Sequence, residues 1–397
     1  MGRKPSTPPV NSDARTILWA SNHPLAPSGY GTQTAQVVSR LTRDGHRVAI
    51  ANNYGTEGFV SSWNGVRVYP KGLAHHSQDA IVAHAKAWAH DNTDPDPLLI
   101  TLYDTWIYGD HLDPLPQVAS WVPIDHTPAP EIVLRYLRKP NVTPIAMSKF
   151  GFAQIENAGI EALYAPHGLE PTWRPTSAYK GTSGRDLMRV PDDAWCITIN
   201  QANKADGVIH RKAWPENLAA SVEMMRRHAD VWLYIHTEAS PSMNGLDIRG
   251  YLDGLNAPMD RISFVDAYAY RLSIPSDALA AIYTATDVLL ACSMGEGFGL
   301  TPLEAQACGT PVVMSDWTAQ PELCGDGWLV KGQPFWHGGS QNAWWLTPSV
   351  GEIVEALEAA YARGSERSQK AIDFARQYDA DAVYDQYWRP ALKVLAP

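Results

Sequence analysis

The chain has 397 residues, of which 45% are hydrophobic and 19% are charged, with 15 tryptophans. This length exceeds one ordinary hydrophobic core and predicts two domains, while the composition excludes a disordered protein. The net charge of −10 is uneven, since residues 1–175 carry −1 and residues 176–397 carry −9. The second half therefore lacks the basic face that nucleic-acid binders usually present.

The first residues, 1–14, are polar and Pro-rich and predict a flexible tail. No apolar signal region follows them, and no apolar run reaches the roughly 18 residues that span a bilayer, so we expect a cytoplasmic protein. None of the four cysteines forms a C-x-x-C pair, which predicts buried reduced thiols rather than a disulfide scaffold or a zinc site. They are Cys196, Cys292, Cys308 and Cys324.

Short apolar runs alternate with helical patterns through the first half of the chain. The predicted strands are 16–20, 46–51, 98–103, 118–123 and 143–147, and a helix is predicted over 32–44 after a Gly-rich turn. Such alternation indicates a parallel sheet covered on both faces. We therefore predict a Rossmann-like N-terminal domain over 15–175.

The pattern restarts after a segment rich in Pro, Ser, Gly and charge, which predicts a linker over 176–194. The predicted strands of the second half are 195–199, 231–236, 261–265, 288–292 and 310–314, and the predicted helices are 215–228, 277–286, 302–308 and 352–363. We expect a second Rossmann-like domain over 195–370 and a C-terminal helical segment over 371–397. Together these elements predict an α/β fold with two parallel-sheet domains.

The stretch GEGFGLTPLEAQACGTPVV, residues 295–313, places two glutamates between a predicted strand and a predicted helix. Ligands of parallel α/β sheets bind beyond the carboxyl ends of strands, helix N-termini favour phosphate, and a carboxylate can accept hydrogen bonds from a diol. A purely structural interpretation also fits, because Thr301 to Glu304 has the pattern of a capping box. Glu296 has no such structural explanation, although a solvated charge in a Gly-rich loop remains an alternative.

This stretch resembles the E-x7-E motif of retaining GT-B glycosyltransferases, specifically the GT4 family, also called glycosyl transferases group 1. The family pattern runs through a Ser and then E-G-F-G-L-x-x-x-E-A-x-A-x-G-x-P-V-V, which nearly every position from Ser293 to Val313 matches. Four further segments resemble family motifs: 24–31, 45–48, 146–151 and 165–170. The resemblance implies two Rossmann-like domains facing each other across a cleft, with the C-terminal helix crossing back to the first domain.

The resemblance also implies roles for individual residues. Glu304 would bind the ribose of a nucleotide, Glu296 would contact the donor sugar, and the imidazole of His126 would touch that sugar near its anomeric centre. A capped turn histidine is the alternative for His126. The remaining donor-binding positions that the resemblance implies are Gly297, Phe298, Gly299, Leu300, Thr301 and, in the glycine loop of the first domain, Gly29 and Gly31.

The chain departs from the family after the first strand of its second domain. Many members carry an Arg directly after this strand and a Lys about five residues later, whereas here the loop is longer and no Arg directly follows the strand. We assign the diphosphate-binding role to Arg211 and Lys212, and Asn203 and Lys204 are the alternative replacements for the missing group. A solvated basic pair is the structural alternative for Arg211 and Lys212.

Two other motifs are weaker. Asp94-Pro-Asp96 matches the D-x-D metal motif of GT-A enzymes, but its Pro-flanked setting predicts a turn. The segment Gly29 to Thr34 approximates a dinucleotide loop but ends in Thr, and the next strand lacks the acidic residue that a ribose would need. We therefore expect no metal and no bound cofactor.

The resemblance thus implies a metal-independent hexosyl- or pentosyltransferase that retains configuration and uses a UDP or GDP sugar. The acceptor is not identified, with a glycan, a lipid or a small molecule favoured. A nucleic-acid base is an alternative, because Arg135, Arg138, Lys139 and Lys149 form a basic cluster in the first half. A non-catalytic nucleotide-sugar-binding protein is a second alternative, and a phosphorylase or an epimerase of the same fold is a weaker one.

Overall fold

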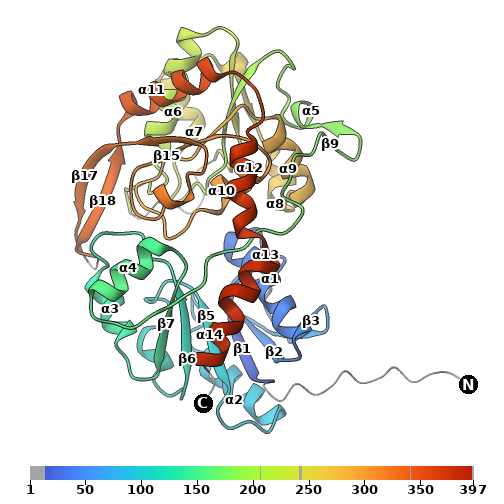
Figure 1. The fold of residues 1–397 in the computed structure, drawn as a ribbon, viewed down its shortest axis with the longest axis vertical. Helices are drawn as coiled ribbons and strands as arrows, with labels where there is room; N and C mark the ends of the chain where they lie inside the picture. The colour runs from blue at the N-terminus through green and yellow to red at the C-terminus, as the bar shows by residue number, and fades with distance from the viewer. Residues whose placement is uncertain (1–13, 206, 241–243, 340, 396–397) are drawn as a thin grey trace, which may run out of the picture.

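The computed structural model describes residues 14–205, 207–240, 244–339 and 341–395, and Figure 1 shows them as two α/β lobes. Nearly all of the predicted tail over 1–14 lies outside the described residues. The lower lobe in Figure 1 holds the N-terminal part of the chain and the upper lobe the following part. Each lobe is built around its own sheet.

The N-terminal sheet has eight strands in the order β3-β4-β2-β1-β5-β6-β7-β8, and all neighbours are parallel except β3 and β4. The strands are β1 Thr16–Ser21, β2 Arg47–Asn52, β3 Ser61–Trp63, β4 Val66–Tyr69, β5 Leu98–Leu102, β6 Val118–Val122, β7 Val142–Ala146 and β8 Leu163–Tyr164. The helices are α1 Gly29–Arg43, α2 Ile81–Asp91, α3 Glu131–Leu137 and α4 Lys149–Asn157, with a 3-10 turn η1 at Gly109–Leu112. The five predicted strands are confirmed.

The second sheet has six parallel strands in the order β13-β12-β11-β14-β15-β16. Its strands are β11 Trp195–Ile199, β12 Val231–Ile235, β13 Ile262–Phe264, β14 Val288–Leu290, β15 Val312–Ser315 and β16 Gly327–Val330. Its helices are α6 Trp214–Arg227, α7 Ile248–Gly254, α8 Ala267–Arg271, α9 Ser276–Ala285, α10 Leu300–Ala307 and α11 Val350–Arg363, with 3-10 turns η2 Met259–Arg261 and η3 Pro321–Leu323. The predicted α/β class with two parallel-sheet domains is therefore confirmed.

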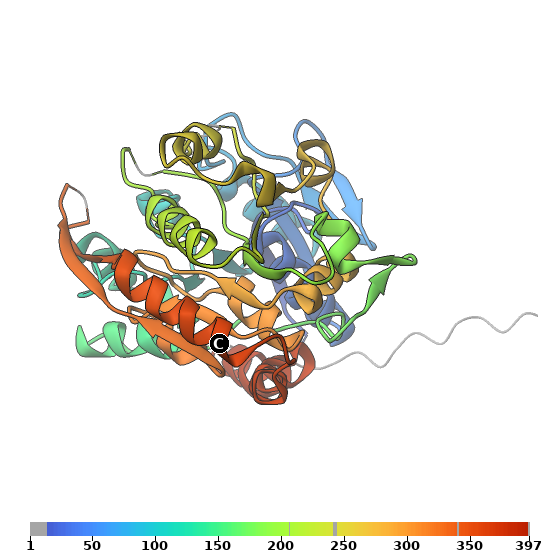
Figure 2. The same ribbon diagram turned by 90° about the horizontal axis from the view of Figure 1, so that it is seen from above.

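Two antiparallel ribbons lie outside these sheets. The first, β9 Ala178–Tyr179 with β10 Thr182–Ser183, leads into α5 Gly184–Met188 within the predicted linker. The second, β17 Gly332–His337 with β18 Ala343–Pro348, was not predicted. Figures 1 and 2 both place the two ribbons on opposite sides of the molecule.

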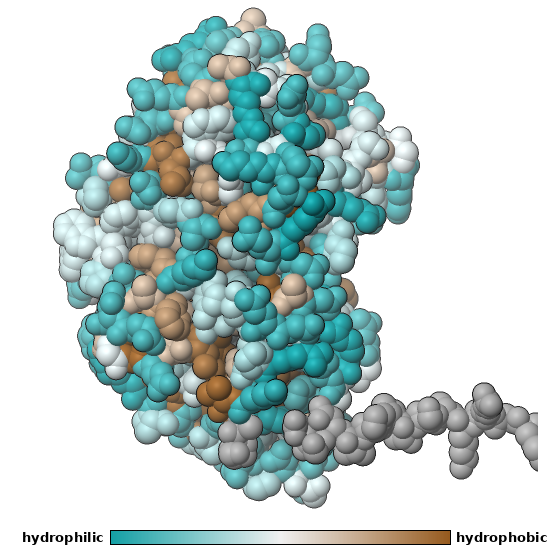
Figure 3. All heavy atoms as spheres, viewed as in Figure 1, coloured by the Kyte–Doolittle hydropathy of each residue, from teal (hydrophilic) through white to brown (hydrophobic). Residues whose placement is uncertain are grey.

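The C-terminal segment returns to the N-terminal lobe, as the resemblance implied. It comprises α12 Gln369–Ala375, η4 Arg376–Tyr378, α13 Ala380–Val383, the π-helical turn η5 Tyr384–Trp388 and α14 Arg389–Val394. Trp388 packs against Trp19 and Trp121 of the N-terminal sheet, with ring centroids 5.7 and 4.8 Å apart, and Arg40 binds Asp381 at 3.0 Å. This segment fixes the two lobes to each other, and Figure 3 shows a mainly hydrophilic face around it.

The cysteines and the helices agree with the sequence-based expectations. All four cysteines are unpaired, and three of them are buried while Cys324 is half-buried. Within the described ranges, every helix is too short or too polar to cross a membrane.

Candidate functional site

The loop between β14 and α10 carries the stretch with the two glutamates, and it lies directly against the N-terminal lobe. A Cβ atom added at Gly295 would stand 2.1 Å from the carbonyl oxygen of Asp125, and one at Gly297 would stand 2.4 Å from Cβ of Pro123. The sequence predicts that these glycines admit a ligand. In the structure, their lack of a side chain lets the segment that follows β6 pack closely against the loop. The candidate site is therefore built from both lobes.

The backbone of this loop offers hydrogen-bond donors. No hydrogen bond among the described residues uses the N–H groups of Gly297, Phe298 and Gly299, and α10 begins directly after them at Leu300. The Phe298 ring is buried against His167, with centroids 4.8 Å apart, and this contact anchors the loop. Unused N–H groups at a helix start form a favourable environment for an anion.

Glu296 lies in this loop as the carboxylate of an ionic network. It accepts a hydrogen bond from Ser293 Oγ at 2.7 Å and forms an ion pair with Lys212, while Arg211 Nη1 lies 3.7 Å from its Oε2. Its own N–H donates to Thr318 Oγ1 at 2.9 Å. Only 14% of its side chain is exposed. The structure therefore brings together three of the predicted catalytic residues, and none of the three is a freely solvated charge.

Arg211 connects this network to the first lobe. Its Nη1 donates to the Gly295 carbonyl at 2.9 Å and lies 3.6 Å from Asp125 Oδ2. Both basic residues precede α6, whose N-cap Ala213 has a left-handed φ of 48°. This turn directs consecutive side chains of the loop toward the same carboxylate.

The network sets the protonation of its members. Burial opposes the charge of Glu296, but Lys212 and Arg211 outweigh it and lower the pKa of Glu296. Burial likewise opposes the charge of Asp125, but the His126 hydrogen bond and the nearby cations lower the pKa of Asp125 to about 2. Both carboxylates are therefore ionised at neutral pH.

His126 lies at the end of the strand β6, where the two lobes meet. Its Nδ1 is 2.6 Å from Asp125 Oδ1 and its Nε2 is 3.1 Å from His337 Nδ1. His337 and the stacked Trp345 belong to the β17–β18 ribbon. The sequence analysis missed both, although a Gly-Gly pair between two aromatic runs is a hairpin signal.

Glu304 lies on α10 in a contrasting environment. Glu304 is 8% exposed, and its Oε2 accepts a hydrogen bond from the Tyr283 hydroxyl at 3.4 Å. No ion pair of Glu304 occurs among the described residues. Burial raises the pKa of Glu304 to about 7.

The predicted capping box at Thr301 to Glu304 is wrong. Gly299 is the N-cap of α10, no side chain caps the helix, and Thr301 lies inside it. Gly299 adopts φ +126°, which a residue with a side chain rarely adopts, and so the helix begins earlier than a hydroxyl cap would allow. Glu304 therefore has no capping role.

The predicted glycine loop at Gly29 and Gly31 is helical in the structure. Both residues lie in the first turn of α1, whose N-cap Ser28 accepts a hydrogen bond from the Gly31 N–H at 3.0 Å. Gly31 is required by packing, because an added Cβ would lie 2.5 Å from the Ala26 carbonyl. A Cβ at Gly29 would lie 3.1 Å from Leu300 Cδ1, so the starts of α1 and α10 lie side by side.

The structure separates the two candidates in the long loop after β11. Asn203 donates from Nδ2 to the carbonyls of Glu238 and Leu246 at 3.0 and 2.8 Å and accepts from the Leu246 N–H at 2.8 Å. These bonds use both of its amide protons to hold the loop, so Asn203 is not free to donate to a phosphate. Lys204 is different, since burial and the charge of Arg211 both lower its pKa.

Asp104 is a site residue that the sequence analysis missed. It follows β5 as Asp125 follows the adjacent strand β6, and the carboxyl ends of parallel strands meet at one edge of a sheet. Burial and the neighbouring charge of Asp125 raise the pKa of Asp104 to about 6. This spacing could have identified it from the sequence.

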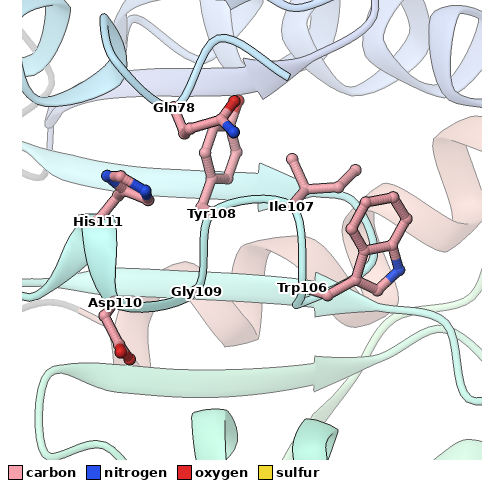
Figure 4. Close-up of a pocket in the computed structure, with 7 residues that line it drawn as sticks. All are labelled: Gln78, Trp106, Ile107, Tyr108, Gly109, Asp110 and His111. Atoms are coloured by element: carbon pink, nitrogen blue, oxygen red, sulfur yellow. The ribbon is translucent and has the colours of Figure 1, made fainter. Parts of the chain in front are cut away.

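A pocket of about 430 Å³ opens on the N-terminal lobe in the segment that follows β5, where Trp106 to His111 line it together with Gln78. Figure 4 shows Trp106 at one end and His111 and Asp110 at the other, with Gln78 and Tyr108 between them. Trp106 is 50% exposed. An exposed indole together with amide, carboxyl and imidazole groups suits a ligand that has an apolar face and several hydroxyls.

The D-x-D motif is confirmed as a turn, because the Asp96 N–H donates to Asp94 Oδ1 at 3.1 Å. In the part of the chain that the structure describes, no group of three or more His, Cys, Asp or Glu side chains is arranged to hold a metal ion.

Comparison with known sequences connects this geometry to a family. The family profile described as "Glycosyl transferases group 1" matches residues 218–361. A D-inositol 3-phosphate glycosyltransferase of Segniliparus rotundus is 33% identical over 185 residues, which cover 45% of this chain and 38% of that protein. The match thus spans well under half of this relative.

Solved structures match over nearly the whole chain. The sucrose-phosphate synthase from Thermosynechococcus elongatus has a TM-score of 0.74 at 17% identity, covering 96% of this chain and 99% of the other. The Anabaena protein HepE, solved in complex with UDP and glucose, has a TM-score of 0.64 at 13% identity, covering 96% and 100%. At these identities the likeness shows the fold, which is GT-B.

Proposed function

We propose that this chain is a retaining glycosyltransferase that uses a nucleoside diphosphate sugar, because residues 218–361 match the profile of the glycosyl transferases group 1 and the fold is GT-B. One observation carries the proposal: Glu296, Lys212 and Arg211 form a charged cluster that faces His126 across the contact between the lobes. The UDP-bound neighbour supports a UDP donor, and GDP is the alternative. The transferred sugar is a hexose or a pentose.

The diphosphate of the donor binds at the start of α10. Arg211 and Lys212 supply positive charge there, and the unused N–H groups of Gly297, Phe298 and Gly299 supply fixed hydrogen-bond donors. These groups stabilise the negative charge that develops as the diphosphate leaves. Preorganised donors of this kind contribute roughly 2.7–4 kcal/mol each to transition-state stabilisation.

The ribose of the donor binds Glu304. A buried carboxyl group without a cation is stabilised as an anion when hydroxyl groups donate to it. Two vicinal ribose hydroxyls provide such donors, and they replace the single long hydrogen bond from Tyr283. Leu300 and Thr301 line the same turn of α10 between the two glutamates.

The sugar lies between Glu296 and His126, and the transfer takes place there. An acceptor oxygen bonds to the anomeric carbon on the face that the diphosphate leaves, while the bond between that carbon and the phosphate oxygen breaks. The acceptor proton passes to an oxygen of the departing phosphate, as the family resemblance implies. This route retains configuration and needs no separate protein base.

The acceptor binds the N-terminal lobe, and the pocket lined by Trp106, Tyr108 and His111 is the candidate position. The basic cluster that suggested a nucleic-acid base is largely neutralised, because Lys139 pairs with Asp110 at 2.6 Å and Arg138 with Glu131 at 2.6 Å. A hydroxylated small molecule, glycan or lipid headgroup is therefore favoured. Strong, salt-dependent binding of DNA at low ionic strength would contradict this preference.

The test is nucleotide release. The protein is incubated with UDP-, GDP- and ADP-sugars and candidate acceptors, and the freed nucleoside diphosphate is measured. We expect release with one donor class and a product with the anomeric configuration of that donor. Binding without release for every acceptor would indicate a non-catalytic nucleotide-sugar-binding protein, and the absence of both would refute the proposal.

A further inference from the structure

The β17–β18 ribbon belongs to the second lobe but contacts the segment after β6 in the first. The Trp344 N–H donates to the Thr127 carbonyl at 2.9 Å, and the Thr127 N–H donates back to the Trp344 carbonyl at 3.3 Å. The Trp345 Nε1–H donates to the Asp125 carbonyl at 3.2 Å. Three hydrogen bonds therefore hold the ribbon on either side of His126.

At this contact the ribbon supplies a second imidazole. His337 Nδ1 lies 3.1 Å from His126 Nε2, and the two rings are within 9° of parallel. The indole of Trp345 stacks on both, with centroids 4.6 Å from His126 and 4.1 Å from His337. One aromatic surface thus supports a hydrogen-bonded pair of imidazoles.

The chemistry of the partners fixes the protons. The ionised Asp125 carboxylate only accepts hydrogen bonds, so the facing Nδ1 of His126 carries a proton. A single proton then lies between Nε2 of His126 and Nδ1 of His337. Each nitrogen of His126 therefore has a defined partner, one from each lobe.

We infer that His337 is a positioning residue for the proposed transfer: it holds His126 Nε2 in place when the two lobes meet. This inference rests on the proposed function. His126 comes from the first lobe and His337 from the second, so the pair depends on the contact between the two lobes. His337 consequently acts on the turnover of bound donor more than on donor binding itself.

Two substitutions separate the hydrogen bond from the stacking. His337→Asn keeps an N–H donor near the position of Nδ1, whereas His337→Phe keeps a ring on Trp345 and removes both nitrogens. Trp336→Ala is the matched control, because Trp336 lies next in the same strand, is 49% exposed and packs on Trp344, with centroids 5.2 Å apart.

We expect His337→Phe to lower kcat about three- to tenfold, as for the loss of one hydrogen bond, and to change the donor KM less than about twofold. His337→Asn and Trp336→Ala should remain near wild type. An unchanged kcat in His337→Phe would overturn the inference, and so would equal losses in the Asn and Phe variants.

A measurement without turnover tests the pairing itself. The imidazole nitrogens are labelled with ¹⁵N, and the His126 signals are identified by their loss in His126→Gln. We expect the Nε2 signal of His126 to shift in His337→Phe, while Nδ1 keeps its proton. Unchanged His126 signals would overturn the inference even if the enzyme is active. If wild type releases no nucleotide, the proposed function fails while the NMR result still tests the pair.

Discussion

The two glutamates of the E-x7-E stretch occupy opposite electrostatic environments although eight positions separate them. Glu296 lies in a loop where Lys212 and Arg211 compensate its burial, so its pKa is lowered. Glu304 lies on a helix where Tyr283 is its hydrogen-bond partner, so burial raises its pKa to about 7. One carboxylate is paired by cations of the protein, and we propose that the other is paired by the ribose of the donor.

In the proposed function, this difference assigns a different part of the donor to each of the two glutamates. The compensated cluster at Glu296 can exchange one of its ionic contacts for a phosphate or a sugar hydroxyl without creating a lone buried charge. The carboxyl group of Glu304 favours donors such as ribose hydroxyls. Substitutions at each position should therefore have effects of opposite sign.

The largest effect is expected for Lys212→Ala. It removes a cation from the proposed diphosphate site, so we expect kcat to fall by about 10²–10³. Nucleotide release measures this, with Lys86→Ala on the exposed surface of α2 as the control. A loss of less than about threefold would show that Lys212 only compensates Glu296.

Glu296→Gln should destabilise the fold. It leaves Lys212 and Arg211 without their carboxylate, and breaking a buried ion pair costs about 3–5 kcal/mol. Since the folded-state pKa lies below the usual 4.5, the contribution of Glu296 is present above that pH and is lost as the pH falls. Urea unfolding at pH 7 and pH 4 measures it, and the exposed Glu161→Gln serves as the control. Equal stability of Glu296→Gln and wild type at pH 7 would contradict the claim that the ion pairs of Glu296 stabilise the fold.

Glu304→Gln should stabilise the ligand-free protein at alkaline pH. The folded-state pKa of about 7 lies above the unfolded value of 4.5, so Glu304 favours the folded state below 4.5 and loses this contribution as the pH rises through 7. A neutral amide does not titrate. Between pH 4.5 and pH 8, we expect the free energy of unfolding of the variant to rise by up to about 3 kcal/mol relative to that of wild type. If the difference in free energy of unfolding between the variant and wild type does not change with pH, the raised pKa of Glu304 is contradicted.

The smallest effect is expected for Thr301→Ala. Because Thr301 lies within α10 and caps nothing, the free energy of unfolding should change by less than about 0.5 kcal/mol. Ser148→Ala is the comparison, since Ser148 caps α4 through the Gly151 N–H at 3.0 Å and its loss should cost about 1 kcal/mol. If thermal unfolding shows equal losses of stability in Thr301→Ala and Ser148→Ala, Thr301 caps the helix after all.

The sequence allowed both sheets to be predicted because most of their strands are short, continuous apolar runs that alternate with helical patterns. Residues of the candidate site could be proposed from the sequence where they follow such strands or stand in a recognisable motif, as for His126, Glu296 and Lys212, and their roles stay predictions. The short strands β3 and β4 at one end of the first sheet, of three and four residues, were not predicted because they are too short to show a period.

The remaining errors concern contacts between distant segments. Thr301 looked like a cap because the pattern cannot show that Gly299 turns the chain into the helix earlier. Asn203 looked free because its partners, Glu238 and Leu246, lie more than thirty residues away. His337 was missed because only the fold brings its ribbon onto His126.

The role of Glu304 can be tested most directly by removing the ribose hydroxyls. Calorimetry compares the binding of the preferred nucleoside diphosphate with that of its 2′,3′-dideoxy form, in wild type and in Glu304→Gln. Hydrogen bonds to a charged group contribute about 1.5–3 kcal/mol each, so wild type should prefer the hydroxylated nucleotide by at least about tenfold. In Glu304→Gln we expect this preference to shrink to about threefold or less. Equal discrimination by both proteins would contradict the assignment of Glu304 to the ribose.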